Sequence, residues 1–225
     1  MSSFFRRSLT ILLGGLALFT LQACDSAGAK PTLPDPAVNE APSPHAALQT
    51  AVLAGGCFWG MEEVFQHVKG VTAVVAGYSG GAADTAHYEM VSDGNTGHAE
   101  SVKITYDPAK ITYGQLLKVY FSVAHNPTEL NYQGPDHGTQ YRSTIFTANP
   151  EQQHIAQAYI QQLQTAKLFS RPIVTTTTRL QKFYPAEAYH QDYAMRHPHD
   201  PYIMIYDLPK LTALRQQFPS LYKGS

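Results

Sequence analysis

The sequence predicts an α+β domain built as a two-layer α/β sandwich, in which helices pack on a sheet and an irregular C-terminal tail follows. Segments with the patterns of strands and helices alternate along the chain from residue 49 onward. Of the 225 residues, 44% are apolar and 15% are charged, which suffices for a packed core. The length favours one folded domain with appendages. Periodicity leaves the strand order open.

Five segments have the alternating pattern and the boundaries of strands. They are residues 50–54, 71–78, 99–106, 142–147 and 173–180. The first ends at Gly55-Gly56 and the third ends at Asp107-Pro108, and both pairs are typical of turns. A glycine-rich loop, Ser79-Gly80-Gly81, follows the second.

A first helix is expected just after Cys57. The apolar residues Met61, Val64, Phe65 and Val68 recur there at helical spacing.

Two further helices are expected later in the chain. One covers the amphipathic segment 112–125. The other covers 150–169 and begins at Asn149-Pro150-Glu151, which supplies a capping residue and a first-turn proline. The tail is predicted to hold only short helical pieces, because prolines recur at positions 185, 198, 201, 209 and 219.

Residues 1–23 have the pattern of an export signal. Arg6 and Arg7 precede an apolar run over about residues 9–21, which is too short for a mature membrane-spanning helix. The segment ends Leu21-Gln22-Ala23-Cys24, which resembles the lipobox of bacterial lipoproteins. The resemblance implies that Cys24 is lipidated and that the exported protein is anchored to a membrane of the cell envelope, facing the periplasm. The alternative is a cleaved signal peptide followed by an incidental cysteine.

Residues 24–48 are rich in proline, alanine and small polar residues. This composition is typical of a semi-extended linker, which would hold the folded domain away from the bilayer. The domain itself is predicted over residues 49–225.

The net charge and the cysteine content limit the classes of function that fit the sequence. The formal net charge is −1 and no basic cluster is present, so a nucleic-acid partner is not expected. The chain has two cysteines, Cys24 and Cys57. If Cys24 carries lipid, Cys57 is a lone thiol in an oxidising compartment, and a chemical role is the reason to keep it.

Cys57 lies between a strand that ends in two glycines and the start of a helix. Unpaired backbone N–H groups and the helix dipole stabilise negative charge there, which is expected to lower the thiol pKa from about 8.5 toward the physiological range. Glu62 and Glu63 weaken this field, so full ionisation would need bound substrate. The alternative is a buried, inert cysteine.

Two aromatic residues, Phe58 and Trp59, follow the cysteine directly. Beside a nucleophilic sulfur they would form a pocket for a small apolar or thioether-like group. The alternative for each is core packing.

The motif Gly56-Cys57-Phe58-Trp59-Gly60 resembles the signature of the A-type peptide methionine sulfoxide reductases, which act on the S epimer at sulfur. Further segments resemble the same family in the same order. They are AGYSGG at 76–81, GHAESV at 97–102, DHGTQYRS at 136–143, AEAYHQDY at 186–193, and a tail with PYI, D-x-P-K and FPSLY. The resemblance covers nearly everything from residue 50 to the end and implies a ferredoxin-like core with a mixed sheet.

The resemblance implies that the Cys57 thiolate attacks the sulfoxide sulfur and that Glu100 donates the proton to the departing oxygen. A position beside aromatic surface would raise the pKa of Glu100 and keep it protonated. Tyr78 and Tyr141 match tyrosines whose hydroxyls hydrogen-bond the sulfoxide oxygen. The plain alternatives are a solvated carboxylate and two half-buried tyrosines.

Four more residues are carried over by the same resemblance. Phe58 and Trp59 would hold the S-methyl group, and Asp136 and His190 match positions that line the same site. The products would be methionine and a sulfenic acid on Cys57, with no metal or organic cofactor. A metal site at His197 and His199 is not expected, because other convergent ligands are lacking.

The tail lacks the further cysteines with which many members of the family resolve the sulfenic acid. An external thiol, from a thioredoxin-like, glutaredoxin-like or small-molecule donor, would then recycle Cys57 directly. The substrate would be methionine sulfoxide, either free or in oxidised proteins, and a monomer is expected.

Two other functions fit a lone reactive cysteine. One is a one-cysteine peroxidase or thiol transferase, which would not need the aromatic pair, Glu100 and the two tyrosines. The other is a tethered binding or scaffold lipoprotein in which Cys57 is structural. Turnover of methionine sulfoxide against peroxide, and the rate at which Cys57 reacts with iodoacetamide, separate these functions.

Overall fold

The computed structural model describes residues 32–41 and 47–224. The predicted export signal and Cys24 lie outside these residues, as does part of the predicted linker. Within the described ranges, no helix is both long and apolar enough to cross a membrane.

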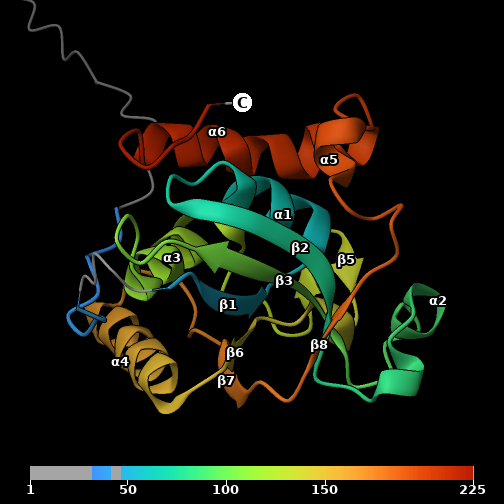
Figure 1. Ribbon diagram of the computed structural model, residues 1–225, viewed down its shortest axis with the longest axis horizontal. Helices are drawn as coiled ribbons and strands as arrows, with labels where there is room; N and C mark the ends of the chain where they lie inside the picture. Colours follow the sequence, from blue (N-terminus) through green and yellow to red (C-terminus); the bar gives the residue numbers. More distant parts are fainter. Residues whose placement is uncertain (1–31, 42–46, 225) are drawn as a thin grey trace, which may run out of the picture. The chain divides into compact units, whose positions relative to one another are not determined.

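The described part of the chain forms one six-stranded sheet and a separate two-stranded ribbon (Figure 1). The strands are β1 (Gln49–Ala54), β2 (Val71–Ser79), β3 (Ala99–Tyr106), β4 (Tyr132–Gln133), β5 (Asp136–His137), β6 (Thr144–Thr147), β7 (Thr176–Arg179) and β8 (Phe183–Pro185). The larger sheet has the order β7-β6-β1-β3-β2-β8, and β4 pairs with β5. Its neighbours are antiparallel except β6 and β7, which are parallel, so the sheet is mixed.

The helices of the described ranges are α1 (Phe58–Gln66), α2 (Tyr88–Val91), α3 (Tyr113–Val119), α4 (Pro150–Ala166), α5 (Tyr193–Arg196) and α6 (Leu208–Gln217). Two π-helical turns extend this set, Tyr120–Ala124 after α3 and Ile203–Asp207 before α6.

The central elements follow one another as β1-α1-β2-β3-α3-β6, which is the β-α-β-β-α-β order of ferredoxin-like folds. Their strands lie side by side as β6-β1-β3-β2. The predicted α+β fold with a ferredoxin-like core and a mixed sheet is confirmed.

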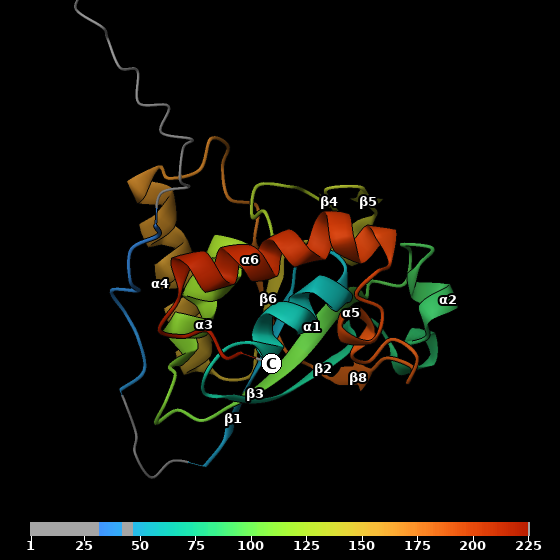
Figure 2. The same cartoon turned by 90° about the horizontal axis from the view of Figure 1, so that it is seen from above.

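The tail differs from the predicted run of short helical pieces, because α6 is a regular helix of ten residues. Pro209 stands in its first turn, where a missing backbone N–H breaks no helical hydrogen bond. Figure 2 shows α6 running over α1 and the end of α3, on the side of these helices away from the sheet. The tail therefore covers the helix that begins just after Cys57.

The predicted helix at 112–125 is divided in two. Thr112 begins it with a capping box, in which its hydroxyl accepts the N–H of Gln115 at 3.2 Å and its own N–H donates to the Gln115 side chain at 2.9 Å. The α-helix ends at Val119 and continues as the π-helical turn to Ala124.

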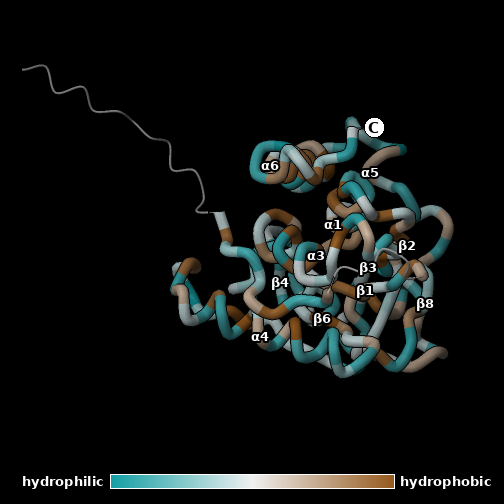
Figure 3. The backbone as a smooth tube through the Cα atoms, turned by 60° about the vertical axis from the view of Figure 1, so that its left-hand side comes forward, coloured by the Kyte–Doolittle hydropathy of each residue, from teal (hydrophilic) through white to brown (hydrophobic). Residues whose placement is uncertain are grey.

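Helix α4 begins as predicted, with the side chain of Asn149 accepting the N–H of Gln152 at 2.8 Å. It ends earlier than predicted, because Lys167 adopts a left-handed conformation with φ 51°. In Figure 3 its tube alternates between hydrophilic and hydrophobic residues, as expected for a helix with one buried face.

Buried residues fall on both faces of the sheet. In β1 the side chain of Leu53 belongs to the main core cluster, whereas Val52 and Ala54 belong to a smaller one with Ala99 and Phe146. Successive residues of a strand point to opposite faces, so β1 has its side chains in both clusters.

Residues 32–41, the first described part of the predicted linker, lie against α3 and α4. The N–H of Ala37 donates to the side chain of Gln162 at 2.9 Å. The Glu40 carboxylate accepts the N–H of Tyr113 at 2.7 Å, at the first residue of α3. This stretch of the predicted semi-extended linker is therefore bound to the domain, whose predicted start was residue 49.

Candidate active site

Two glycines shape the connection between β1 and α1. A Cβ atom at Gly55 would lie 2.7 Å from the ring of His125, which is too close for any other residue. Gly56 has φ +86°, and a Cβ atom there would lie 2.8 Å from the side chain of Gln133. Both positions therefore need glycine. The N–H of Gly56 donates to the carbonyl of Tyr141 at 3.2 Å, which fixes the turn.

Cys57 is the N-cap residue of α1, and its thiol is free. The residue is 8% exposed. Burial raises the pKa of this thiol well above its ordinary value, and negative charge on Glu100 and Asp207 raises it further. The N–H of Trp59 acts in the opposite direction. The prediction of a lowered pKa is thus wrong for the protein without substrate, because desolvation and two carboxyl groups outweigh the helix terminus.

Glu100, on β3, accepts a hydrogen bond from the first backbone N–H group of α1. Its Oε2 accepts the N–H of Phe58 at 3.0 Å, one residue beyond Cys57. The residue is 3% exposed. Burial raises the pKa of Glu100 to about 8, the Phe58 N–H lowers it, and the charge of Asp136 raises it. Near neutral pH the protonated form of this carboxyl is therefore favoured.

Glu62 and Glu63 bind partners other than the cysteine. Glu62 accepts the N–H of Asp192 at 2.8 Å, and Glu63 lies 3.7 Å from His67. Burial raises the pKa of Glu62 to about 7 and also raises that of Glu63.

An aromatic cluster surrounds the residues that follow Cys57. The ring of Trp59 stacks on Tyr193 at 3.8 Å between centroids and meets Tyr202 edge-on at 5.9 Å. Phe58 is fully buried, with its centroid 5.0 Å from the His190 ring. The structure therefore brings Phe58, Trp59 and His190 together.

His190 fixes the orientation of the indole. The Nε1–H of Trp59 donates to Nδ1 of His190 at 3.2 Å. Because Nδ1 accepts, the ring proton of neutral His190 is on Nε2, which is buried and has no partner among the described residues. Burial lowers the pKa of His190, which favours the neutral ring.

The hydroxyl groups of the two predicted tyrosines have different surroundings. Tyr78 is fully buried, and its hydroxyl donates to Glu187 at 2.8 Å, so this hydroxyl already has a partner. Tyr141 is partly exposed, and after burial the charges of Glu100 and Cys57 are what raise its pKa. The charge of Glu100 raises the pKa of both tyrosines, but the Tyr78 hydroxyl is already bound to Glu187, whereas the charge of Cys57 is a further cause for Tyr141.

Tyr88, on α2, is a site residue that the sequence argument did not select. Burial raises its pKa to about 12, and the next causes are the charges of Glu100 and Cys57. Its ring lies 4.4 Å from that of His190. Tyr78 and Tyr88 flank the same glycine-rich loop, and their order in the sequence does not show which one faces the cysteine.

Asp136, on β5, lies near Glu100 and accepts a hydrogen bond from the hydroxyl of Tyr202. Burial raises the pKa of Asp136. Tyr202, also missed by the sequence argument, therefore links the ribbon to the ring of Trp59.

The D-x-P-K motif of the tail, residues 207–210, lies against the first turn of α1. Asp207 is buried, and the Lys210 ammonium donates to its carboxylate at 3.0 Å. A Cβ atom at Gly60 would overlap with the Asp207 carboxylate and lie 2.8 Å from the ammonium, so this ion pair lies directly on the first turn of α1. Lys210 lowers the pKa of Cys57 while Asp207 raises it.

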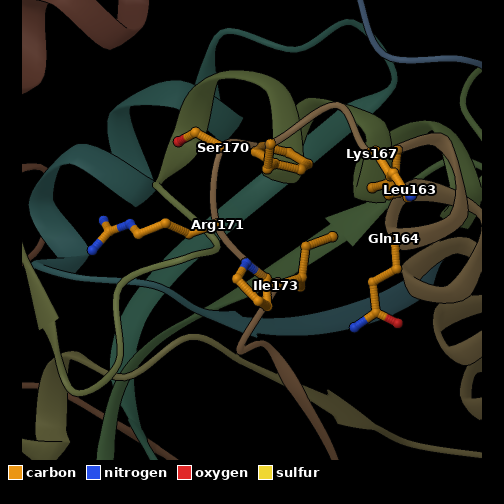
Figure 4. Close-up of a pocket in the computed structure, with 8 residues that line it drawn as sticks. Leu163, Gln164, Lys167, Ser170, Arg171 and Ile173 are labelled. Carbon is orange, nitrogen blue, oxygen red and sulfur yellow. The ribbon is translucent and has the colours of Figure 1, made fainter.

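A separate cavity of about 400 Å³ lies away from these residues. Figure 4 shows its lining, with Leu163, Gln164 and Lys167 at the end of α4 and Ser170, Arg171 and Ile173 on the following segment. It contains none of the predicted site residues. Within the described ranges, no group of three or more acidic, histidine or cysteine side chains is placed to hold a metal ion.

Sequence comparison identifies relatives over most of the chain. The family profile described as peptide methionine sulfoxide reductase matches residues 49–221. Peptide methionine sulfoxide reductase MsrA 2 of Mesorhizobium japonicum is 65% identical over 174 residues, which are 77% of this chain and 89% of the relative. The protein of the same name from Synechocystis is 52% identical over 194 residues, which are 85% of this chain and 91% of the relative.

Solved structures resemble the same domain. Mxr1 from Saccharomyces cerevisiae in its reduced form has a TM-score of 0.62 at 31% identity and covers 69% of this chain and 89% of its own. Methionine sulfoxide reductase A of Corynebacterium diphtheriae has a TM-score of 0.59 at 32% identity and covers 78% of this chain and 89% of its own.

Proposed function

Since the chain belongs to the peptide methionine sulfoxide reductase family and is an enzyme that reduces methionine sulfoxide, we propose that Cys57 carries out this reduction with Glu100 as the proton donor. The substrate is the S epimer, either free or within oxidised proteins. The observation that carries the proposal is the buried Glu100 carboxyl group, which accepts the backbone N–H one residue beyond the cysteine and whose pKa is raised by this burial.

The raised pKa values of Cys57 and Glu100 determine the order of the proton transfers. Glu100 gives its proton to the sulfoxide oxygen as the Cys57 sulfur attacks the sulfoxide sulfur. The Glu100 carboxylate formed in this way takes the proton of the thiol, so the thiolate arises at the moment of attack. In sum, one thiol and one sulfoxide give one sulfenic acid and one thioether. The cysteine sulfur is oxidised by two electrons and the methionine sulfur is reduced by two.

Tyr88 and Tyr141 are the hydroxyl donors to the sulfoxide oxygen. Both are partly exposed, and both have a raised pKa to which the charges of Glu100 and Cys57 contribute, which supports a place beside the reacting atoms. A raised pKa keeps each hydroxyl protonated and able to donate. We assign this role to Tyr88 in place of Tyr78, since the Tyr78 hydroxyl is bound to Glu187.

The S-methyl group of the substrate lies against Phe58 and Trp59. The stacking of Trp59 on Tyr193 and the hydrogen bond from its indole N–H to His190 support a rigid apolar wall. Asp136 contributes by holding the hydroxyl of Tyr202, whose ring lies edge-on to Trp59. With the methyl group on this wall and the oxygen at the tyrosines, only one configuration at sulfur leaves the sulfur open to Cys57.

An external thiol recycles the enzyme. Besides Cys57, the chain contains only Cys24, which is the proposed lipidation site. A first thiol displaces water from the Cys57 sulfenic acid to give a mixed disulfide, and a second releases Cys57 and a disulfide of the reductant. The donor is a thioredoxin-like, glutaredoxin-like or small thiol.

We further propose that residues 1–23 direct export and that Cys24 anchors the protein to a membrane through lipid. The lipobox-like end of this segment supports the anchor, and the linker and domain then follow. Cys24→Ser is expected to release the protein from the membrane fraction with unchanged specific activity, and continued membrane association would contradict the anchor.

The reaction is tested with each epimer of methionine sulfoxide under excess dithiothreitol. The S epimer should be reduced and the R epimer should remain unreduced. After one turnover without reductant, dimedone should label the sulfenic acid on Cys57. Cys57→Ser should lose turnover, because a hydroxyl is far less acidic and nucleophilic than a thiol. Cys24→Ser is the matched control. Turnover by Cys57→Ser, or preference for the R epimer, would contradict the proposal.

A further inference from the structure

Three exposed methionines each follow a tyrosine of the aromatic cluster by two residues. The pairs are Tyr88 with Met90, Tyr193 with Met195, and Tyr202 with Met204. Each pair stands on a short helical stretch: α2, α5, and the turn that leads into α6.

The three tyrosines all face the site. The ring of Tyr88 lies 4.4 Å from His190, and the rings of Tyr193 and Tyr202 lie 3.8 Å and 5.9 Å from Trp59. Residues two apart on a helical turn are separated by about 200° around its axis. Each methionine is therefore on the side of its turn that faces away from the site.

The exposure of the three methionines agrees with this geometry. Met90 is 42% exposed, Met195 is 57% exposed and Met204 is 52% exposed. Met61, on α1, is 1% exposed and belongs to the core. Among the methionines that the structure describes, those that solvent reaches are thus the three on the turns that carry the tyrosines of the aromatic cluster.

We propose that Met90, Met195 and Met204 are oxidation sites of this enzyme and that a second copy of the enzyme reduces them again. The proposal rests on the proposed function, because it names the enzyme's own surface as a substrate. Hydrogen peroxide transfers one oxygen to an exposed thioether and leaves as water. The second copy then forms methionine and a Cys57 sulfenic acid, which two external thiols return to the thiol with release of water.

The repair must take place between two molecules. Each methionine is exposed and lies about 200° around its turn from the tyrosine that faces the site, so its side chain starts on the side away from the Cys57 of its own molecule. A second copy can approach the exposed thioether from solvent. The neighbouring exposed side chains Ile205 and Tyr206 add apolar surface beside Met204 for this encounter.

The test uses a substrate copy that cannot repair itself. Full-length Cys57→Ser, labelled with a heavy nitrogen isotope, is treated with peroxide, cleared with catalase and mixed with untreated enzyme and dithiothreitol. Mass spectrometry then follows the oxygen on each methionine peptide. Peroxide forms both epimers in comparable amounts, so the sulfoxide at the three sites should fall by about half and then stop. Met61 should stay unoxidised, which reports that the fold is intact.

The controls separate this proposal from the proposed function. Untreated Cys57→Ser in place of the enzyme should leave all sulfoxide unchanged, and a Met90→Leu, Met195→Leu, Met204→Leu substrate copy should show no oxygen at these peptides. Free methionine sulfoxide is added to the same mixture as an internal standard. Reduction of the free substrate with no loss at the three peptides would overturn the proposal alone. No reduction of either would overturn the function as well.

Discussion

Two acids share the start of α1, and burial raises the pKa of both. Glu100 holds its proton up to about pH 8, and Cys57 holds its thiol proton well above its ordinary range. A neutral carboxyl does not repel the developing thiolate, whereas an ionised one does. Near neutral pH both Cys57 and Glu100 therefore keep their protons.

The assignment of the oxygen donors predicts opposite behaviour for two tyrosines. Tyr88→Phe should slow sulfenic acid formation at least ~10-fold, because one donor to the developing charge is lost. Tyr78→Phe should change this rate little and lower the free energy of unfolding, since it removes the partner of a buried hydroxyl and leaves the partly buried Glu187 carboxylate without one of its donors. Single-turnover kinetics and urea unfolding of both variants check this. A larger rate loss in Tyr78→Phe would reverse the assignment.

Single residues were predictable where a short motif carried them. Cys57, Phe58 and Trp59 lie together because they are adjacent in the sequence, and Glu100 reaches them through β3. The direction of the shift in the Cys57 pKa was not predictable, because burial and the charge of Asp207, about 150 residues away in the sequence, depend on the folded chain. Tyr88 was missed because Tyr78 and Tyr88 flank the same loop, and only the folded structure shows that the Tyr78 hydroxyl is bound to Glu187.

At the level of elements, the start of α1 is held from outside by the tail. The ion pair of Asp207 and Lys210 lies on Gly60, where no side chain fits. The π-helical turn before α6 carries Asp207 to this place, and π-helical turns are frequent at functional sites.

This contact predicts that Gly60→Ala disturbs the site without touching a reacting group. The new methyl group would displace the Asp207 carboxylate, which should cost about 1–3 kcal/mol of the free energy of unfolding. Sulfenic acid formation should slow as well, because Trp59 and Cys57 lie on the same turn. Gly224→Ala is the control, since no atom lies near its Cβ position. Urea unfolding of Gly60→Ala with the stability of the wild type would refute the contact.

The main elements follow from local sequence, and the small ones do not. β1, β2, β3 and the starts of α1 and α4 agree with apolar spacing, turns and caps. The ribbon of β4 and β5 and the strand β8 have two or three residues each, too few for a periodic signal. The helix α6 was missed because the prolines of the tail favour irregular structure, although Pro209, the one proline within α6, stands in its first turn.

At the scale of the whole molecule, the domain includes more of the chain than its periodic part. Residues 32–41 bind α3 and α4, with Asp35 2.8 Å from the Lys118 ammonium. Composition alone favours a linker there, because proline-rich stretches have no apolar period. The strand order was also not predictable, since pairing depends on long-range contacts that periodicity does not encode.

Buried carboxyls make the stability of the molecule depend on pH. The pKa of Glu62 is about 7 in the folded protein, against about 4.3 in an unfolded chain. The folded state therefore holds an extra proton between these values, and stability falls as pH rises through this window. The urea midpoint should be lower at about pH 8 than at about pH 5, and Glu62→Gln should reduce the difference. A difference unchanged by this substitution would contradict the raised pKa.

The central claim is that Glu100 supplies the proton to the sulfoxide oxygen, and single-turnover kinetics across pH test it most directly. In the wild type the rate of Cys57 sulfenic acid formation should fall above about pH 8, where Glu100 loses its proton. Glu100→Gln should be slower by ~10²-fold and should lack this fall. Glu40→Gln, which alters a half-buried carboxyl on the docked segment 32–41, should behave as the wild type. A Glu100→Gln variant with the rate and pH profile of the wild type would contradict the account.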